Sequence, residues 1–266
     1  MDLLRPWLEY IKPFKMADNL YFVGAKGGSS HVIDTGEGLI MIDSGYPQTL
    51  YQVIENMHIM GLNPMDIKYI VHSHGHYDHL GATKALVELT GAKTFLGEAD
   101  RDFANGTVDL TWAKELGAEY GEAFEPDVLL KDGDVITLGN TKIRCVSTPG
   151  HTPGTMSFFF NAFYKGKEYA CGMHGGVGVN SMEKWFLEKY NLPYSCREDF
   201  VNSFKKVRNE KVEIFVGNHV GNNKTLEKMT KITDDFNPFI NENEWVEFLD
   251  TMEDYFHRVM AEEKNK

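Results

Sequence analysis

Short apolar runs separated by glycine-containing turns dominate the first part of the chain. The runs 21–23, 30–33 and 39–42 are rich in β-branched and aromatic residues. This pattern predicts an antiparallel meander of three strands. Apolar residues then recur at helical spacing over 47–60, with proline in the first turn and glycine just after the end. That stretch is predicted to be a helix.

The remaining pattern repeats strand and helix signals in two runs of similar length. The segment 100–127 is acidic and loop-rich, and we expect it to fold over a cleft and set the size of the substrate. No internal repeat or linker is visible, so a single domain over 1–266 is the simplest interpretation. Such runs predict an α/β fold in which two sheets pack face to face with helices outside. The other predicted strands are 69–71, 93–96, 135–138, 142–146, 156–160, 168–171 and 213–216, and the other helices are 80–89, 197–209 and 242–263.

Composition narrows the class of protein and of partner. The 266 residues are 42% hydrophobic and 25% charged, which is typical of a globular protein. The formal net charge of −12 disfavours binding to a phosphate backbone. No apolar run approaches 18 residues, the start lacks a signal-peptide pattern, and three scattered cysteines suggest reduced thiols. We therefore expect a cytoplasmic enzyme with a small-molecule substrate and neither nucleic acid nor membrane as partner; the oligomeric state is left open.

The strongest chemical signal is a cluster of four potential metal ligands, His74, His76, Asp78 and His79, at the end of a predicted strand. In extended backbone, residues two apart point the same way, so the first two histidines can reach one ion. The chain then turns into a helix, which directs Asp78 and His79 toward a second ion. Imidazole and carboxylate ligands suit Zn²⁺, with Fe and Mn as competitors.

Two later histidines also follow predicted strands. His151 lies in the turn Thr-Pro-Gly-His-Thr-Pro-Gly, and His219 follows the strand at 213–216. Three protein ligands per ion leave a position for water, which is typical of catalytic zinc. The predicted ligand sets are His74, His76 and His151 for one ion, and Asp78, His79 and His219 for the other.

These motifs resemble those of the metallo-β-lactamase fold superfamily. The segments 17–24, 41–46, 130–139 and 237–240 are further similar to the third subclass of metallo-β-lactamases, which uses only His and Asp as ligands. The resemblance covers about residues 17–250 and implies an αβ/βα four-layer sandwich. It also implies two zinc ions and a metal-bound hydroxide that cleaves an amide or ester bond, as in a β-lactam ring. Asp78 is then catalytic as well as a ligand, because it aims the hydroxide.

Three residues qualify this resemblance. Many superfamily hydrolases, such as glyoxalase II and the lactonases, carry a bridging Asp midway between the two later histidines. This chain has Cys171 there, which is either a ligand of the second metal or a small buried hydrophobe. His174 stands where the similar lactamases place a hydroxyl residue that contacts the substrate; it is either a substrate-binding residue or a solvated loop residue. Asp43 is similar to a family position that orients a ligand by a hydrogen bond, although a turn-forming role is the alternative.

Other functions fit parts of the pattern. A cytosolic lactone, ester or thioester hydrolase is the main alternative, since the missing leader and the presence of His174 both weaken β-lactam specificity. An iron-dependent oxygenase or sulfur dioxygenase would share the histidine run. A non-catalytic metal-binding module is a further alternative. A flavin-linked diiron reductase is disfavoured because His76 stands where its motif has Glu, and the net charge disfavours a nuclease.

Overall fold

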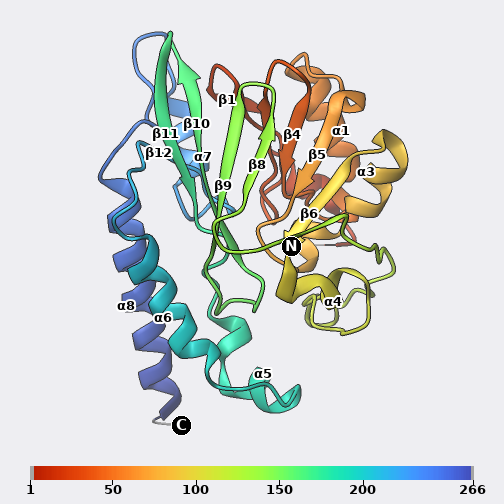
Figure 1. Ribbon diagram of the computed structural model, residues 1–266, viewed down its shortest axis with the longest axis vertical. Coiled ribbons are helices and arrows are strands. Elements are labelled where there is room, and N and C mark those ends of the chain that lie inside the picture. Colours follow the sequence, from red (N-terminus) through yellow and green to blue (C-terminus); the bar gives the residue numbers. More distant parts are fainter. Residues whose placement is uncertain (1–2, 265–266) are drawn as a thin grey trace.

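The computed structural model describes residues 3–264 and has four layers (Figure 1). Two β-sheets pack face to face. Helices α1 (Leu50–Ile59) and α3 (Thr83–Thr90) cover the outer face of one sheet, while α6 (Cys196–Val207) and α8 (Glu244–Lys264) cover that of the other. The predicted αβ/βα sandwich is confirmed.

The strands of each sheet follow a simple order. Within the described residues the first sheet runs from β1 to β7 in chain order, antiparallel up to β4 and parallel from β4 to β7. The second has the order β12-β11-β10-β9-β8, and only the β11–β12 pair is parallel. The strands are β1 (Phe14–Ala17), β2 (Leu20–Phe22), β3 (His31–Asp34), β4 (Leu39–Ile42), β5 (Ile67–Val71), β6 (Lys93–Gly97), β7 (Val128–Leu130), β8 (Val135–Leu138), β9 (Thr141–Ser147), β10 (Met156–Tyr164), β11 (Lys167–Met173) and β12 (Ile214–Phe215).

The central strands are apolar throughout because both of their faces are buried. In β4, Ile40 and Ile42 point into the core between the sheets, whereas Met41 packs under α1 and α3. In β10, Phe158 faces the same central core and Phe159 packs under α6 and α8. Since successive side chains of a strand point to opposite faces, an uninterrupted apolar run fills two cores at once.

Both sheets gather their functional residues at one edge. The parallel strands β4, β5 and β6 end at the same side, so Asp43, the loop 72–79 and Asp100 lie together. Strands β9, β11 and β12 also run in one direction, which brings His151 and His219 to the corresponding edge of the second sheet. Ligands of α/β proteins bind outside the carboxyl ends of such strands.

Several boundaries differ from the sequence predictions. The helix predicted at 80–89 is two helices, α2 (Tyr77–Leu80) and α3, separated at Gly81 and Ala82. The helix predicted at 47–60 begins with a 3₁₀ turn, η2 (Pro47–Thr49). The short strands β1 and β7 were not predicted. No helix in residues 3–264 has the length and apolar character needed to cross a bilayer. The other helical elements are η1 (Pro6–Glu9), η3 (Pro64–Asp66), η4 (Glu98–Asp100), α4 (Arg101–Ala104), η5 (Lys114–Leu116), η6 (Asn180–Met182), α5 (Lys184–Lys189), α7 (Thr225–Lys228) and η7 (Met229–Lys231).

A buried histidine in β3 predicts acid sensitivity of the fold. His31 is completely buried, and neither ring nitrogen has a hydrogen-bond partner among the described residues. Burial lowers its pKa from 6.5 to about 4 against the opposing effect of Asp43. The folded state therefore binds fewer protons than the unfolded state between these pH values, and stability falls as pH decreases through this window. We expect the titration of His31 alone to lower the free energy of unfolding by about 2 kcal/mol when the pH decreases from 7 to 5.

Urea unfolding of metal-free protein at both pH values tests this expectation. His31→Phe should remove about 2 kcal/mol of the pH-dependence, because phenylalanine fills a similar volume without titrating. Equal pH-dependence in the two proteins would contradict it.

Candidate metal centre

The loop after β5 and the start of α2 together place four donor groups within six residues of chain, from His74 to His79. Residues 73–76 form a bent loop, and His76 has extended dihedral angles (φ −85°, ψ 154°) immediately before α2. His74 and His76 can therefore approach the same point from the loop. Asp78 and His79 are the second and third residues of α2 and lie beside His219 at a neighbouring point. The change from loop to helix at His76 separates the motif into two pairs of donors, His74 with His76 and Asp78 with His79.

The first donor set consists of His74, His76 and His151. Their donor atoms all lie within 4.8 Å of one another, and all three residues are buried. The Nε2 atoms of His74 and His151 are 3.2 Å apart. The ring of His76 lies 4.8 Å from that of His74 and 4.5 Å from that of His151, between centroids. The structure thus brings together three residues that are far apart in the sequence.

The hydrogen bonds of this set fit a bound cation. Nδ1 of His74 lies 2.8 Å from the carbonyl oxygen of Gly175, and Nδ1 of His151 lies 2.6 Å from that of Gly178. A carbonyl only accepts, so each Nδ1 carries the proton. Burial lowers the pKa of both imidazoles, which leaves them neutral with an unprotonated Nε2. Two lone pairs then face each other across 3.2 Å, an arrangement that a metal ion between them would stabilise.

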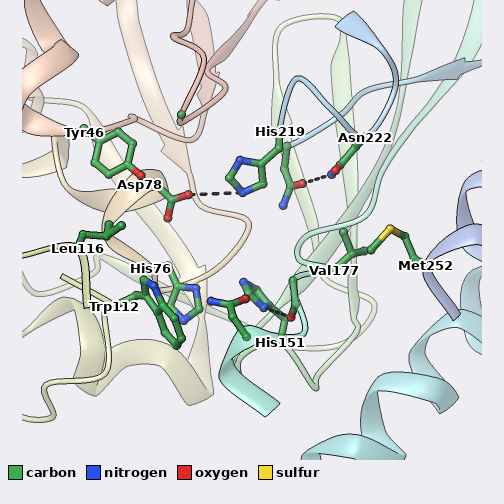
Figure 2. A pocket seen from close by; sticks show the side chains of 14 residues that line it. Tyr46, His76, Asp78, Trp112, Leu116, His151, Val177, His219, Asn222 and Met252 are labelled. Carbon is green, nitrogen blue, oxygen red and sulfur yellow. Dashed lines mark hydrogen bonds and ion pairs between the residues drawn. The ribbon is translucent and has the colours of Figure 1, made fainter. Parts of the chain in front are cut away.

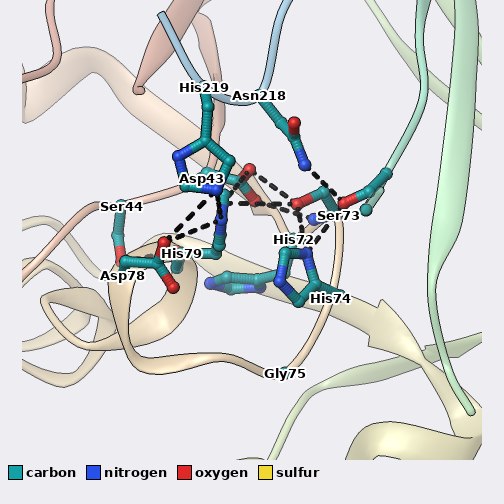
Figure 3. A network of polar contacts seen from close by, with 12 residues as sticks. Asp43, Ser44, His72, Ser73, His74, Gly75, Asp78, His79, Asn218 and His219 are labelled. Atoms are coloured by element: carbon teal, nitrogen blue, oxygen red, sulfur yellow. Dashed lines mark hydrogen bonds and ion pairs between the residues drawn. The ribbon is translucent and has the colours of Figure 1, made fainter. Parts of the chain in front are cut away.

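The second donor set consists of Asp78, His79 and His219 (Figure 3). Oδ2 of Asp78 lies 3.2 Å from Nε2 of His79 and 3.4 Å from Nε2 of His219. The two Nε2 atoms are 3.2 Å apart. Burial lowers the pKa of His79, but the carboxylates of Asp78 and Asp43 outweigh it and raise that pKa to about 10. In the absence of metal, a proton on this imidazole compensates the buried carboxylates.

Asp43 connects the second donor set to the sheet (Figure 3). Its carboxylate accepts hydrogen bonds from the backbone N–H and hydroxyl of Ser73, both at 2.7 Å, and from Nδ1 of His79 at 2.8 Å. These contacts fix the ring of His79 with Nε2 directed at Asp78. Such a carboxylate behind a histidine orients the ligand and raises its basicity. Asp43 is itself held in a left-handed conformation, with φ of 58°.

Removing this carboxylate should weaken metal binding without removing a ligand. We expect Asp43→Asn to reduce zinc affinity by about 10- to 100-fold, because the amide no longer fixes the charge and tautomer of His79. Competition with a chromophoric zinc chelator measures the affinity. The exposed Asp66 offers a matched control, Asp66→Asn, that should bind zinc like the unmodified protein. Equal affinities for both variants would exclude this role.

Asp100 is a site residue that sequence reasoning missed. Its buried carboxylate accepts hydrogen bonds from the backbone N–H of Gly75 (2.7 Å), the hydroxyl of Thr152 (2.6 Å) and the backbone N–H of Gly154 (2.7 Å). Gly75 separates His74 from His76, and Thr152 follows His151. Burial raises the pKa of Asp100 to about 6, against the opposing effect of these hydrogen bonds. One side chain thus joins the two loops that form the first donor set.

Two residues singled out in the sequence lie away from the donor atoms. The ring of His174 is buried against Phe204 and Trp245, at 5.2 and 6.5 Å between centroids, and does not line the cavity described below. It is therefore not a solvated loop residue, and in this structure it lies outside the cavity wall. Cys171 packs in the core between the sheets, and burial raises the pKa of its thiol. Among the described residues, no cluster of potential metal-binding atoms contains this sulfur.

An open cavity of about 350 Å³ lies over the two donor sets (Figure 2). The segment 100–127 contributes Trp112 and Leu116 to its wall, in agreement with the predicted position over the cleft. Met252 of α8 lines the opposite side. The four donor residues in the wall are His76, Asp78, His151 and His219. A substrate in this cavity would therefore contact both metal positions.

Comparison with known proteins agrees with this geometry. A model of the metallo-β-lactamase superfamily matches residues 23–162. The chain belongs to this superfamily. The match contains β3 to β9 and the first five of the six candidate ligands. The family recognised from the sequence motifs is thereby confirmed.

Solved structures and curated proteins extend the comparison. The chain is similar to BJP-1, a subclass B3 metallo-β-lactamase of Bradyrhizobium japonicum, at 27% identity and a TM-score of 0.86 over 98% of each chain. It is 30% identical over 120 residues to an uncharacterised Aquifex aeolicus protein, which is 45% of this chain and 52% of that protein. It is 26% identical over 96 residues to PksB of Bacillus subtilis, a probable polyketide biosynthesis zinc-dependent hydrolase, with 36% of each chain covered. The chain thus spans about half or less of these two curated relatives.

Proposed function

We propose that this protein is a dinuclear zinc hydrolase that cleaves an amide or ester bond, as in a β-lactam-like ring, in a small-molecule substrate. The single observation that carries the proposal is that the donor atoms of His74, His76 and His151 cluster beside those of Asp78, His79 and His219 beneath one open cavity. The family match and the similarity to BJP-1 and PksB support a metal-dependent hydrolase. Iron or manganese would compete for the same donors.

The chain supplies the arrangement in which such chemistry operates. Zinc bound to these ligands would lower the pKa of a coordinated water to about 7 and polarise the scissile carbonyl. Asp78 lies in the cavity wall, so its carboxylate is placed to accept a hydrogen bond from the attacking water and orient it. Asp43 holds His79, and Asp100 holds the loops of His74 and His151, so the donor atoms need little rearrangement. We infer that the chain acts as a single cytoplasmic domain.

A specific observation favours lactones, esters or thioesters as alternative substrates. Among the described residues that line the cavity, none is Lys or Arg, so no protein cation is available to bind a substrate carboxylate. Apart from the four donor residues, its polar side chains are those of Tyr46, Asn180, Asn218 and Asn222. The sequence-based suggestion that His174 binds the substrate carboxylate is not supported by its buried position.

Metal analysis combined with a hydrolysis panel tests the proposal. Protein purified without added metal should contain zinc, and after saturation it should bind about two equivalents. Nitrocefin, acyl-homoserine lactones and acyl-glutathione distinguish lactam, lactone and thioester hydrolysis. Iron in the purified protein would favour an oxygenase instead, and two bound zinc ions without hydrolysis of any panel member would favour a metal-binding module. Normal hydrolysis with less than one equivalent of metal would overturn the dinuclear mechanism.

A further inference from the structure

A second, smaller cavity lies directly behind the first donor set. It has a volume of about 120 Å³, and His76 and His151 line both cavities. The rest of its wall comes from three separate segments: α4 with the loop after it, the turn that carries His151, and the stretch from η6 to the start of α6. It therefore adjoins the position at which a scissile bond would be held.

The wall of this side cavity is apolar. Five large apolar side chains line it, and no Asp, Glu, Lys or Arg of the described chain does; the five are Phe103, Leu110, Phe186, Leu187 and Leu192. Removing apolar surface from water is favourable, whereas an uncompensated charge would be strongly disfavoured there. The cavity is thus suited to an uncharged hydrocarbon group.

Its size limits that group further. A cavity of about 150 Å³ lined by Leu, Ile and Phe takes up one benzene molecule in another protein. A volume of 120 Å³ is close to this and excludes fused rings or long chains. A phenyl ring or a short branched alkyl group therefore matches it.

Side-chain contacts connect the two chain segments that form the walls of the side cavity. The carboxylate of Glu115 accepts hydrogen bonds from the hydroxyl of Tyr190 at 2.5 Å and from Nζ of Lys189 at 2.8 Å. The ring of Trp112 packs on that of Phe186, at 4.6 Å between centroids. These contacts hold the segment 100–127 against the region of α5.

We propose that this side cavity is a subsite for a small uncharged apolar substituent next to the bond that the enzyme cleaves. The inference rests on the proposed hydrolase function and deepens it, because it names a substrate class: acyl compounds bearing a phenyl-sized group. Because His76 and His151 line both cavities, we assign the side cavity to a part of the same substrate.

The activity test compares two esters of the same alcohol on the zinc-loaded protein, an acetyl and a phenylacetyl ester. Cys196 lines the side cavity at the first residue of α6, and Cys196→Phe should fill it. We expect this variant to lower the phenylacetyl-to-acetyl ratio of kcat/KM by about tenfold or more, the range that one hydrophobic contact contributes to discrimination. Ser195→Phe is the matched control, since Ser195 is exposed and does not line the cavity; it should keep the original ratio. An unchanged ratio in Cys196→Phe would overturn the proposal.

A binding test decides the proposal separately from any hydrolysis. Cys145 and Cys171 are buried, so N-ethylmaleimide should modify Cys196 first. Toluene, as an uncharged probe of the right size, should slow this modification several-fold at saturation. Protection without hydrolysis of either ester or of any member of the hydrolysis panel would leave the subsite supported and the hydrolase function rejected. Modification at the same rate with and without toluene would reject the subsite even if both esters are cleaved.

Discussion

Replacing His76 with alanine is expected to remove bound metal from the first donor set and nearly all hydrolytic activity. Two histidines would remain there, whereas catalytic zinc sites use three protein ligands. A metal ion contributes several kcal/mol of transition-state stabilisation, and each ~1.4 kcal/mol is a factor of ten in rate. We therefore expect kcat/KM to fall by at least about several hundredfold. Metal content by mass spectrometry and initial rates on the best panel substrate measure the two effects.

A histidine outside the centre provides the comparison. His58 lies on α1 and is exposed, so His58→Ala removes the same side chain without touching either donor set. It should retain two metal equivalents and normal rates. Retention of full activity by His76→Ala would show that the histidine cluster is not the reaction centre. Loss of activity in both variants would instead point to a general effect on folding, which circular dichroism of each variant checks.

The ligand cluster was visible in the sequence because its signals are local. The spacing of His74, His76 and Asp78 is short, and it directly follows an apolar strand, so both the donors and their common edge could be inferred. His151 and His219 also follow strands, and the sheet topology brings them to the same edge. The local cluster and the two later histidines could both be placed because each inference requires only the position and direction of a strand.

Residues whose position depends on packing could not be placed in this way. His174 follows β11 directly, and adjacent residues of an extended chain point to opposite sides. The backbone of Gly175 faces His74, whereas the ring of His174 points away toward Phe204. No sequence pattern indicated which of the two neighbours faces the centre.

The segment 100–127 shows the same limitation. The sequence predicted that this segment lies over the cleft, but it did not indicate its conformation. Trp112 has a φ of 68°, uncommon for a bulky residue, and its ring packs on those of Trp185 and Phe186. Tertiary contacts therefore determine the wall of the cavity.

Asp100 was likewise overlooked because its partners, Gly75 and Gly154, are backbone groups that carry no sequence signature.

Substitutions of Asp100 are expected to lower the free energy of unfolding, and alanine more than asparagine. In Asp100→Ala three donors, the N–H groups of Gly75 and Gly154 and the hydroxyl of Thr152, lose their acceptor. Each buried unsatisfied donor costs about 1–3 kcal/mol, so the free energy of unfolding should fall by about 3 kcal/mol or more. Zinc affinity should fall as well, because the two loops of the first donor set are no longer joined. Urea unfolding in the presence of chelator and zinc competition measure the two losses.

The variant Asp100→Asn separates hydrogen bonding from charge. Oδ2 accepts from both Gly75 and Thr152, whereas Oδ1 accepts from Gly154 alone. An amide oxygen at the Oδ2 position would keep two of the three bonds, so Asn should be clearly less damaging than Ala. Asp102→Ala, at an exposed neighbour, should change neither stability nor affinity. Equal losses for Asn and Ala would mean that the negative charge, and not the pattern of acceptors, holds the two loops together.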